Sequence, residues 1–449
     1  MHEVLDVRET ACAVVGAGPA GAMLALLLAR QGIPTVLLEA HADFDRDFRG
    51  DSIHPAILEA LDAIGLADRL LAELPHRKLH DVTLPTEPPT TLDFSRLPTR
   101  FPYIAMIPQA RFLEFLTAEA ARYPAFELVM RANVRGLIEE DGMVRGARYQ
   151  TPDGWHEVRA LLTVGADGRF SRVRQLSGIR PIATSQPIDV IWFRLPRRAD
   201  DPDGLGARVG HGHLLIMVDR GEQWQIACTI PKGSYPALRA TGLEPLQHTI
   251  ASIVPWLADR VEALADWRQV AVLSVASDRL PRWYKPGLLL IGDAAHVMSP
   301  FGGNGINYAV QDAVAAANIL SEPLRAGQIS VRDLAAVQRR REWPTRITQA
   351  IVGVTQRALV AGLARTRGPA RAPSALRLLP RIPWLRDLPL RWVAFGLRPE
   401  RVSDAVARAS VRVKDVPKRS DRRPPNNPGD PQEERPTVVA VLPSVRRKR

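Results

Sequence analysis

Residues 287–312 combine an acidic side chain, closely spaced glycines and the start of a helix. Asp293 follows the apolar run Leu288–Ile291 and Gly292, a pattern typical of a buried strand that ends in a tight turn. Glycines let a backbone approach a ligand closely, and a helix N-terminus offers free N–H groups to an electron-rich group. We therefore predict a polar-ligand site here, against the simpler alternative of an ordinary connection. Its further candidate residues are Pro300, Gly302, Gly303, Asn304, Gly305 and Asn307.

A second ligand-binding pattern lies at the beginning of the chain. The strand candidate Thr10–Val15 runs into a G-x-G-x-x-G turn, and a helical pattern over Ala22–Arg30 and a strand over Thr35–Leu38 follow. In this context the turn admits a pyrophosphate at the helix N-terminus. Glu39 is placed to accept hydrogen bonds from ribose hydroxyls and to repel a 2′-phosphate, which favours FAD or NAD over NADP. The turn residues predicted to surround the pyrophosphate are Gly16, Gly18, Ala20 and Gly21.

Other polar residues follow strand ends or begin helices. The strand candidate Glu157–Val164 leads to Asp167, Gly168 and Arg174, which again place an aspartate and a glycine at a strand tip. Arg49, in a polar loop, is a candidate to face the electron-rich ring of a cofactor. For His54, in the same loop, helix capping or a buried hydrogen bond is favoured over catalysis.

The elements that must position these residues indicate an α/β fold. Strand patterns over Phe126–Ile138 and Val144–Tyr149 extend a Rossmann-like sheet, whereas residues 187–231 hold apolar strands with no intervening helix of βαβ length. We therefore predict a discontinuous nucleotide-binding domain with an inserted antiparallel-sheet α+β substrate domain and C-terminal helices. The predicted bounds are 1–180 with 270–330, 181–269 and 331–410, followed by a basic disordered tail over 411–449.

Charge and cysteine content narrow the classes of function. Of the formal net charge of +12, half lies in residues 411–449, where eleven Lys/Arg face five Asp/Glu. A solvated tail is therefore favoured over nucleic-acid binding, and weak contact with a membrane surface is left open. Cys12 and Cys228 are far apart in apolar runs, so neither a disulfide framework nor a metal site is expected. We expect a cytoplasmic protein, peripheral to a membrane at most; the oligomeric state is not predicted.

Three motifs in this order, residues 16–21 with Glu39, 167–174 and 292–307, resemble the single-component FAD-dependent aromatic hydroxylases, the p-hydroxybenzoate hydroxylase-like flavoprotein monooxygenases. The resemblance implies that FAD is bound by the first and third motifs, with Asp293 at the ribityl chain and Pro300 to Asn307 beside the flavin ring. It also implies that the second motif supports FAD and NADH or NADPH. Arg49 and Gln109 resemble an arginine and a glutamine that the family places near the flavin.

The resemblance further implies an NAD(P)H-dependent monooxygenase that passes one atom of dioxygen, through a flavin hydroperoxide, to an aromatic, quinone-like or polyketide-type small molecule. No residue is evident as a base for ionising a phenol, so the catalytic residues stay unassigned. A double-bond reductase or a halogenase of the same fold is the alternative, although the halogenase W-x-W-x-I-P signature is only partly matched around Trp224. Residues predicted to line a hydrophobic substrate pocket, with plain core packing as the alternative, are Trp192, Met217, Trp224 and Cys228.

Overall fold

The structure is a computed structural model, and it describes residues 3–45, 50–84, 86–87, 90–184, 186–202, 205–300, 303–365, 370–371 and 387–409. These residues belong to one compact unit, Met1–Lys414. The predicted tail over 411–449 lies outside the described residues, as do Arg49 and Gly302.

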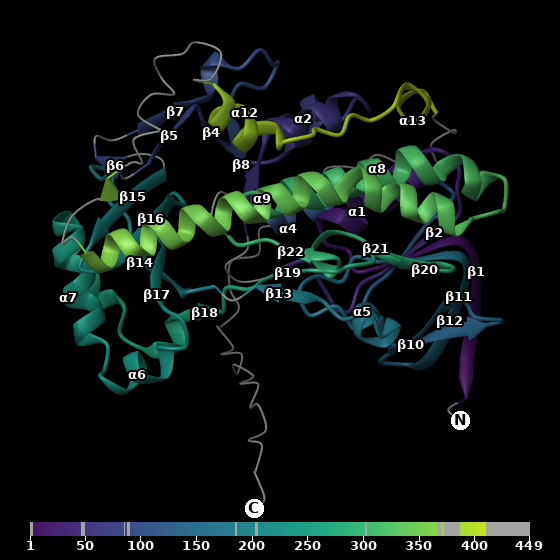
Figure 1. Cartoon of the computed structure of the whole chain (residues 1–449), viewed down its shortest axis with the longest axis horizontal. Helices are drawn as coiled ribbons and strands as arrows, with labels where there is room; N and C mark the ends of the chain where they lie inside the picture. Colours follow the sequence, from purple (N-terminus) through teal and green to yellow (C-terminus); the bar gives the residue numbers. More distant parts are fainter. Residues whose placement is uncertain are drawn as a thin grey trace, which may run out of the picture. The chain divides into compact units, whose positions relative to one another are not determined.

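A sheet with a parallel centre carries the predicted nucleotide-binding motifs (Figure 1). Its parallel strands run in the order β9, β2, β1, β12 and β21, and the β10–β11 hairpin continues the sheet beyond the first half of β12. The strands are β1 (Val4–Val15), β2 (Thr35–Leu38), β9 (Phe126–Val129), β10 (Asn133–Glu140), β11 (Met143–Thr151), β12 (Gly154–Gly165), β20 (Tyr284–Lys285) and β21 (Leu288–Leu290).

The strand predicted over Phe126–Ile138 is in fact two strands. β9 and β10 lie at opposite ends of the sheet order, and the chain crosses between them at residues 130–132. Arg131 adopts a positive φ of 57°, which interrupts an extended conformation that apolar patterning alone favours. The prediction of one strand was therefore wrong at this crossing.

Helices cover the sheet and form the main core with it. α1 (Pro19–Arg30) is rich in Ala and Leu, begins with a proline at its first turn and is buried from Ala20 onward. It packs against α4 (Gln109–Ala121) and α8 (Gly305–Arg325), and α8 packs in turn against the long helix α9 (Val331–Arg365) (Figure 1). The carboxyl ends of β1, β2 and β12 therefore lie next to the helix starts, as a ligand site of this fold class requires.

An antiparallel sheet forms the second layer predicted from the sequence. Its strand order is β15, β16, β17, β14 and β18, and α7 and η2 pack on one of its faces. The elements are β14 (Ile188–Pro196), β15 (Leu205–Gly210), β16 (His213–Asp219), β17 (Gln223–Pro231), β18 (Ala271–Leu273), α6 (Tyr235–Ala240), α7 (Glu244–Ile253), η2 (Pro255–Ala263) and η3 (Trp267–Gln269). The predicted α/β class with an antiparallel α+β layer and C-terminal helices is confirmed.

Shorter elements connect these layers. A three-stranded sheet of β13, β19 and β22 lies next to the 292–295 turn, and α2, α3 and the strands β3 to β8 precede α4. Their bounds are α2 (Pro55–Asp62), α3 (Ala67–Glu73), α5 (Arg172–Ser177), α12 (Leu388–Phe395), α13 (Asp404–Arg408), β3 (Ser52–Ile53), β4 (Arg77–Leu79), β5 (Asp81–Leu84), β6 (Thr86–Glu87), β7 (Thr90–Asp93), β8 (Ile104–Met106), β13 (Ile182–Thr184), β19 (Ser277–Arg279), β22 (His296–Val297), β23 (Ala370–Arg371), η1 (Phe94–Arg96) and η4 (Gly292–Ala294).

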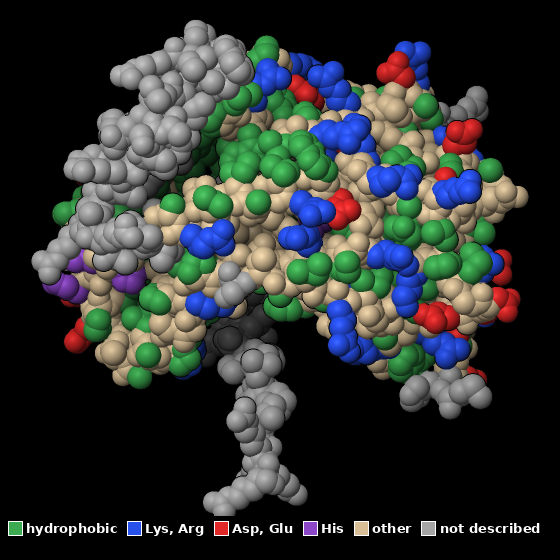
Figure 2. Space-filling view, viewed as in Figure 1, with side chains coloured by type: hydrophobic (Ala, Val, Ile, Leu, Met, Phe, Trp, Pro, Cys, Tyr) green, Lys and Arg blue, Asp and Glu red, His purple; other side chains and the backbone are tan. Residues whose placement is uncertain are grey.

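The surface shows how the basic excess is distributed. On the face drawn in Figure 2, Lys and Arg side chains are spread among polar and apolar ones rather than gathered in one patch. Among the described residues, no helix has the length and apolar character needed to span a membrane, and no group of His, Cys, Asp or Glu side chains there is arranged to hold a metal ion.

Candidate FAD site

The first turn of the site follows β1 and is packed too closely for side chains at two positions. Gly16 has a φ of 97°, and a Cβ on it would lie 2.6 Å from the Cα of Asp167. A Cβ on Gly21 would lie 1.9 Å from the carbonyl oxygen of Gly16. At Gly18, by contrast, the nearest atom would be 3.9 Å away, so this position is open. The turn thus brings the start of α1 close to β12 and leaves room above Gly18 for a ligand.

The carboxylate of Glu39 lies at the end of β2 and faces this turn. It accepts a hydrogen bond from the backbone N–H of Ala17 at 2.9 Å, and the ring Nδ1 of His41 lies 2.7 Å from its other oxygen. Its side chain is nearly buried. Glu39 therefore connects the β1–α1 turn to the end of β2, where the ribose of an adenosine is predicted to bind.

The aspartate of the second motif, Asp167, forms hydrogen bonds with other residues of the protein. Asp167 accepts hydrogen bonds from Ser171 Oγ at 2.5 Å and from Val173 N–H at 3.0 Å, both at the start of α5. Burial raises the pKa of this carboxyl group. Gly168 has a positive φ of 81° in open space. Arg174 donates to the carbonyl oxygen of Arg169 at 2.6 Å.

Arg174 also links the second motif to the third. Its guanidinium lies 3.5 Å from the carbonyl oxygen of Ala294 and 3.5 Å from the carboxylate of Asp278 in β19. Gly292 and Ala294 belong to the short turn η4, which follows β21 directly. The predicted residues of both motifs are therefore brought together at adjacent strand ends, with Asp293 half-buried in the turn.

The end of the loop before α8 and the first turn of that helix contain buried amide atoms that have no hydrogen-bond partner among the described residues. Both polar atoms of the Asn304 side chain, which is 2% exposed, and Nδ2 of Asn307 have no hydrogen-bond partner among the described residues. Asn304 is the N-cap residue of α8, yet its side chain does not cap the helix. A pocket beside it is lined by Gln186, Ser277, Met298, Ser299, Asn304, Gln349, Val352 and Gly353. The loop thus offers hydrogen bonds to a ligand, as the predicted contact with a flavin ring requires.

Residues from the first half of the chain approach this loop. Ser52 Oγ donates to the carbonyl oxygen of Gly303 at 3.4 Å, and a Cβ on Gly303 would lie 3.6 Å from Nε2 of His54. His54 precedes α2 as its N-cap residue and is buried, with Nδ1 2.7 Å from the carbonyl oxygen of Val393. Burial lowers the pKa of His54. This arrangement agrees with the predicted buried hydrogen bond.

Gln109 begins α4 on the same side. Its backbone N–H donates to Asp51 Oδ1 at 3.1 Å. Asp51 also forms an ion pair with Arg220 of the β16–β17 turn. Burial raises the pKa of Asp51, which Arg220 partly counteracts. The half-buried Gln109 therefore lies where the antiparallel sheet joins the nucleotide-binding half.

The four predicted pocket residues divide between the two faces of the antiparallel sheet. Met217, Trp224 and Cys228 are buried in the core that the sheet forms with α7 and η2. Trp192 lies on the opposite face, with Val190, Ala227 and Val275, and is half-buried. Alternation along the strands explains the division, because successive side chains point to opposite faces.

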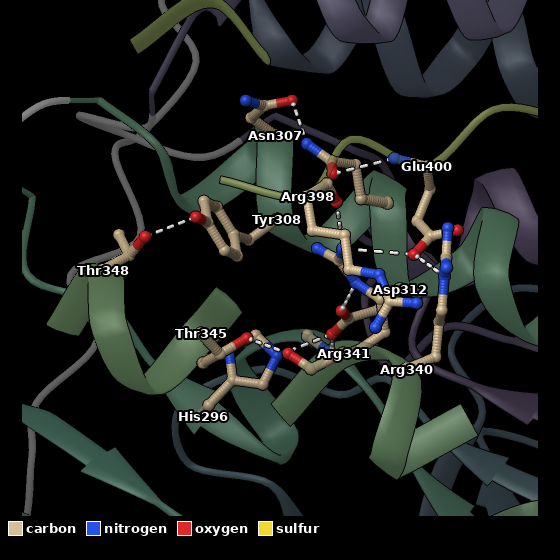
Figure 3. Close-up of polar contacts among 12 residues, drawn as sticks. His296, Asn307, Tyr308, Asp312, Arg340, Arg341, Thr345, Thr348, Arg398 and Glu400 are labelled. Atoms are coloured by element: carbon tan, nitrogen blue, oxygen red, sulfur yellow. Dashed lines mark hydrogen bonds and ion pairs between the residues drawn. The ribbon is translucent and has the colours of Figure 1, made fainter. Parts of the chain in front are cut away.

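A buried charge cluster that the sequence did not identify lies behind the turn at residues 292–296. The carboxylate of Asp312, inside α8, contacts His296 and the guanidinium of Arg341 in α9 (Figure 3). His296 was visible beside the motif without an assigned role, whereas Asp312 and Arg341 each sit in an ordinary helical pattern. The available signal was the position of Asp312 among the alanines and valines of α8, because a carboxylate is rarely buried unless it is paired; Arg341, one of three consecutive arginines, gave no such signal.

The residues present fit an extended FAD. The Gly16–Gly21 turn packs closely on its neighbours but stays open at Gly18, Glu39 stands at the next strand end, and amide atoms of Asn304 and Asn307 at the start of α8 have no hydrogen-bond partner among the described residues. A dinucleotide site shared by two distant chain segments, on a Rossmann-like sheet joined to an antiparallel one, defines a flavoprotein of the hydroxylase fold.

Comparison with known proteins identifies the family. Residues 9–350 match the family model described as an FAD binding domain. The chain is 36% identical over 404 residues to the 6-methylpretetramide 4-monooxygenase of Streptomyces rimosus, covering 88% of this chain and 95% of that enzyme. It is 30% identical over 309 residues to the 12-dehydrotetracycline 5-monooxygenase/anhydrotetracycline 6-monooxygenase of Streptomyces rimosus subsp. rimosus, covering 67% of this chain and 60% of that one.

A solved structure agrees with this assignment. OxyS anhydrotetracycline hydroxylase from Streptomyces rimosus matches with a TM-score of 0.70 and 25% identity, covering 86% of this chain and 76% of that one. The chain belongs to the FAD-binding family of flavoprotein aromatic monooxygenases, and it is an FAD-dependent monooxygenase. The family resemblance seen in the sequence is confirmed.

Proposed function

We propose that this monooxygenase uses NADH or NADPH and dioxygen to hydroxylate a hydrophobic aromatic compound of the polyketide type. One observation carries the proposal. The chain is 36% identical to an enzyme named for oxygenation of 6-methylpretetramide, and the match covers 95% of the length of that enzyme. The tetracycline-type compounds in the names of the second relative and of the solved structure support the same substrate class.

We place the substrate beside Asn304, between the loop before α8 and α9, where the cavity of about 10 Å³ must widen to admit a ring system. The lining side chains are amides, hydroxyls and apolar groups, and none of them is charged. Amides and hydroxyls both donate and accept hydrogen bonds, whereas a buried carboxylate needs a cationic partner. This lining favours a neutral ring system with hydroxyl, carbonyl or carboxamide substituents. Trp192 extends the pocket in this proposal, since Val275 on its sheet face lies two residues before Ser277.

The roles of the cofactor residues follow the same proposal. The turn from Gly16 to Gly21 and the Glu39 carboxylate hold the ADP half, and Asp293 holds the ribityl chain. Gln109, Arg49 and the residues from Pro300 to Asn307 border the ring. The N–H groups at the start of α8 would favour negative charge on a ring bound there, through the helix dipole. When bound, FAD supplies electron transfer and the activation of dioxygen.

A coupled assay tests the proposal. Purified holoenzyme is mixed with NADH or NADPH and a panel of polyketide-type, quinone-like and simple phenolic compounds, and flavin reduction, dioxygen uptake and product mass are recorded. We expect a polyketide-type compound to accelerate flavin reduction and to gain one oxygen atom. Turnover without dioxygen uptake would establish a double-bond reductase, and chloride-dependent product formation would establish a halogenase. A panel in which only carboxylate-bearing substrates are oxygenated would overturn the neutral-substrate assignment.

A further inference from the structure

One buried carboxylate holds both ends of the turn that carries Asp293. Asp312 Oδ2 accepts a hydrogen bond from the backbone N–H of Gly292 at 3.0 Å and another from His296 Nε2 at 2.6 Å. Its other oxygen accepts from Arg341 Nε at 3.0 Å. Figure 3 shows His296 and Arg341 converging on this carboxylate from the turn and from α9.

The charge of this carboxylate is sustained by its partners. The side chains of Asp312, His296 and Arg341 are between 0% and 1% exposed. Burial alone would raise the pKa of Asp312, but His296 and Arg341 outweigh this effect and leave the pKa below its usual value. A buried charge is expensive to leave unpaired, so removing any member disturbs the other two.

The cluster also has a fixed orientation. The His296 ring packs against Trp283 at a centroid distance of 4.9 Å. Arg341 donates to the carbonyl oxygen of Arg398 at 3.1 Å and lies 3.5 Å from the carboxylate of Glu400 (Figure 3). Three segments far apart in the chain therefore hold the Asp312 carboxylate in one place.

The turn itself depends on this anchor. Gly292 has a positive φ of 60°, and its carbonyl oxygen accepts from Ala295 N–H at 2.9 Å. Asp293 stands between the two contacts that Asp312 makes with the turn, at Gly292 and at His296. Rotation of the turn that would carry Asp293 away from the ligand edge would break at least one of these buried hydrogen bonds.

We propose that Asp312 and His296 are positioning residues that fix this turn so that Asp293 is presented to the ribityl chain of FAD. The inference rests on the cofactor role proposed for Asp293. Neither residue needs to touch FAD, because the backbone of residues 292–296 transmits their effect. Loss of either contact is then expected to weaken FAD binding beyond any general loss of stability.

Variants at these positions can be compared with a matched buried carboxylate elsewhere. Asp201 is also buried, and it accepts hydrogen bonds from Arg260 at 2.9 and 3.0 Å and from Trp224 Nε1 at 2.8 Å. It belongs to the antiparallel layer, and among the described residues its carboxylate has no hydrogen bond or ion pair with the turn. Asp201→Asn therefore removes a similar buried charge and serves as the control for general destabilisation.

The experiment measures the Kd of FAD for apoprotein by flavin fluorescence quenching, together with the thermal midpoint. We expect Asp312→Asn and His296→Leu to raise the Kd at least tenfold. His296→Gln, which keeps an N–H donor near the Nε2 position, is expected to stay within about threefold of wild type. Asp201→Asn should lower the thermal midpoint and leave the Kd within about twofold. Equal weakening of FAD binding by Asp201→Asn and Asp312→Asn would overturn the proposal, as would wild-type affinity in His296→Leu.

A double-mutant cycle with Asp293→Ala separates positioning from stability. If Asp312 acts through Asp293, Asp312→Asn adds little to the Kd once Asp293 is already alanine, whereas independent effects multiply. If Asp312→Asn does not fold, His296→Leu takes its place in the cycle, because Arg341 still pairs with Asp312. Wild-type FAD affinity in Asp293→Ala would refute the role of Asp293 itself. Neither measurement uses NAD(P)H or an aromatic substrate, so failure of the proposed hydroxylation leaves this test intact.

Discussion

Replacing Gly21 by alanine places a methyl group where the backbone of the β1–α1 turn already lies. The new Cβ would be 1.9 Å from the carbonyl oxygen of Gly16, whereas ordinary contacts of this kind span 3.4–4 Å. α1 has to move by about 1.5 Å to relieve the overlap, but it is buried from Ala20 to Arg30 and has no space to enter. Overpacking of this kind costs about 1–3 kcal/mol, and for a unit as large as Met1–Lys414 the thermal midpoint of the apoprotein should fall by about 1 °C for each kcal/mol.

Gly18→Ala is the matched control for this substitution. Gly18 has a φ of −70° and ψ of −178°, which suit alanine, and its Cβ would have 3.9 Å of clearance. We expect the free energy of unfolding of this apoprotein to stay within about 0.5 kcal/mol of wild type, but FAD to bind weakly because the methyl group faces the predicted pyrophosphate. Calorimetry of the two apoproteins and FAD titration distinguish the effects. An unchanged midpoint in Gly21→Ala, or an equal loss in Gly18→Ala, would refute the packing argument.

Three further predictions follow from the site and its surroundings. Glu39→Ala should weaken FAD binding about tenfold or more, since a charged-group hydrogen bond contributes about 1.5–3 kcal/mol. Titrating Glu39→Ala and Glu39→Gln with FAD and comparing the two Kd values shows how much the charge contributes. Burial lowers the pKa of His54, so the unfolded chain binds more protons than the folded chain as the pH falls. The free energy of unfolding should therefore decrease from pH 7.5 to pH 5.5, and decrease less in His54→Asn, as denaturant titration at both pH values can check. Burial raises the pKa of the Cys12 and Cys228 thiols to about 12; Ellman's reagent at pH 8 should therefore label neither in the folded protein and both after denaturation, and rapid labelling of the native protein would contradict their burial.

The sequence predicts the nucleotide-binding half well because its signals are local. A strand, a glycine turn and a helix follow each other within residues 10–30, and turn chemistry determines their arrangement. β15 was not predicted, since its two glycines and its arginine weaken the apolar pattern expected of a strand. The segment is a strand because it pairs along its whole length with β16, which is a tertiary effect that local patterning does not show.

The site shows the same division between local and distant information. Glu39 and Asp293 are recognisable from their positions after apolar strands, whereas the contact between Asp312 and Arg341 joins two helices whose relative placement no local pattern specifies. Alternation places Trp192 and Cys228 on opposite sheet faces, but it does not say which face α7 covers. That choice depends on packing of residues 244–263, which follow the strands in the chain.

The split cofactor site has a consequence for how the protein is made. β1 can pair with β2 early in synthesis, but its other neighbour, β12, and then β21 become available only much later. A nascent chain that ends before Gly292 carries only the ADP half of the site, and one that ends before Arg341 leaves the Asp312 carboxylate without its guanidinium partner. Contacts so distant in sequence form slowly, because a long loop must close before they contribute. We therefore expect FAD to be bound late in biogenesis, after α9 has been synthesised.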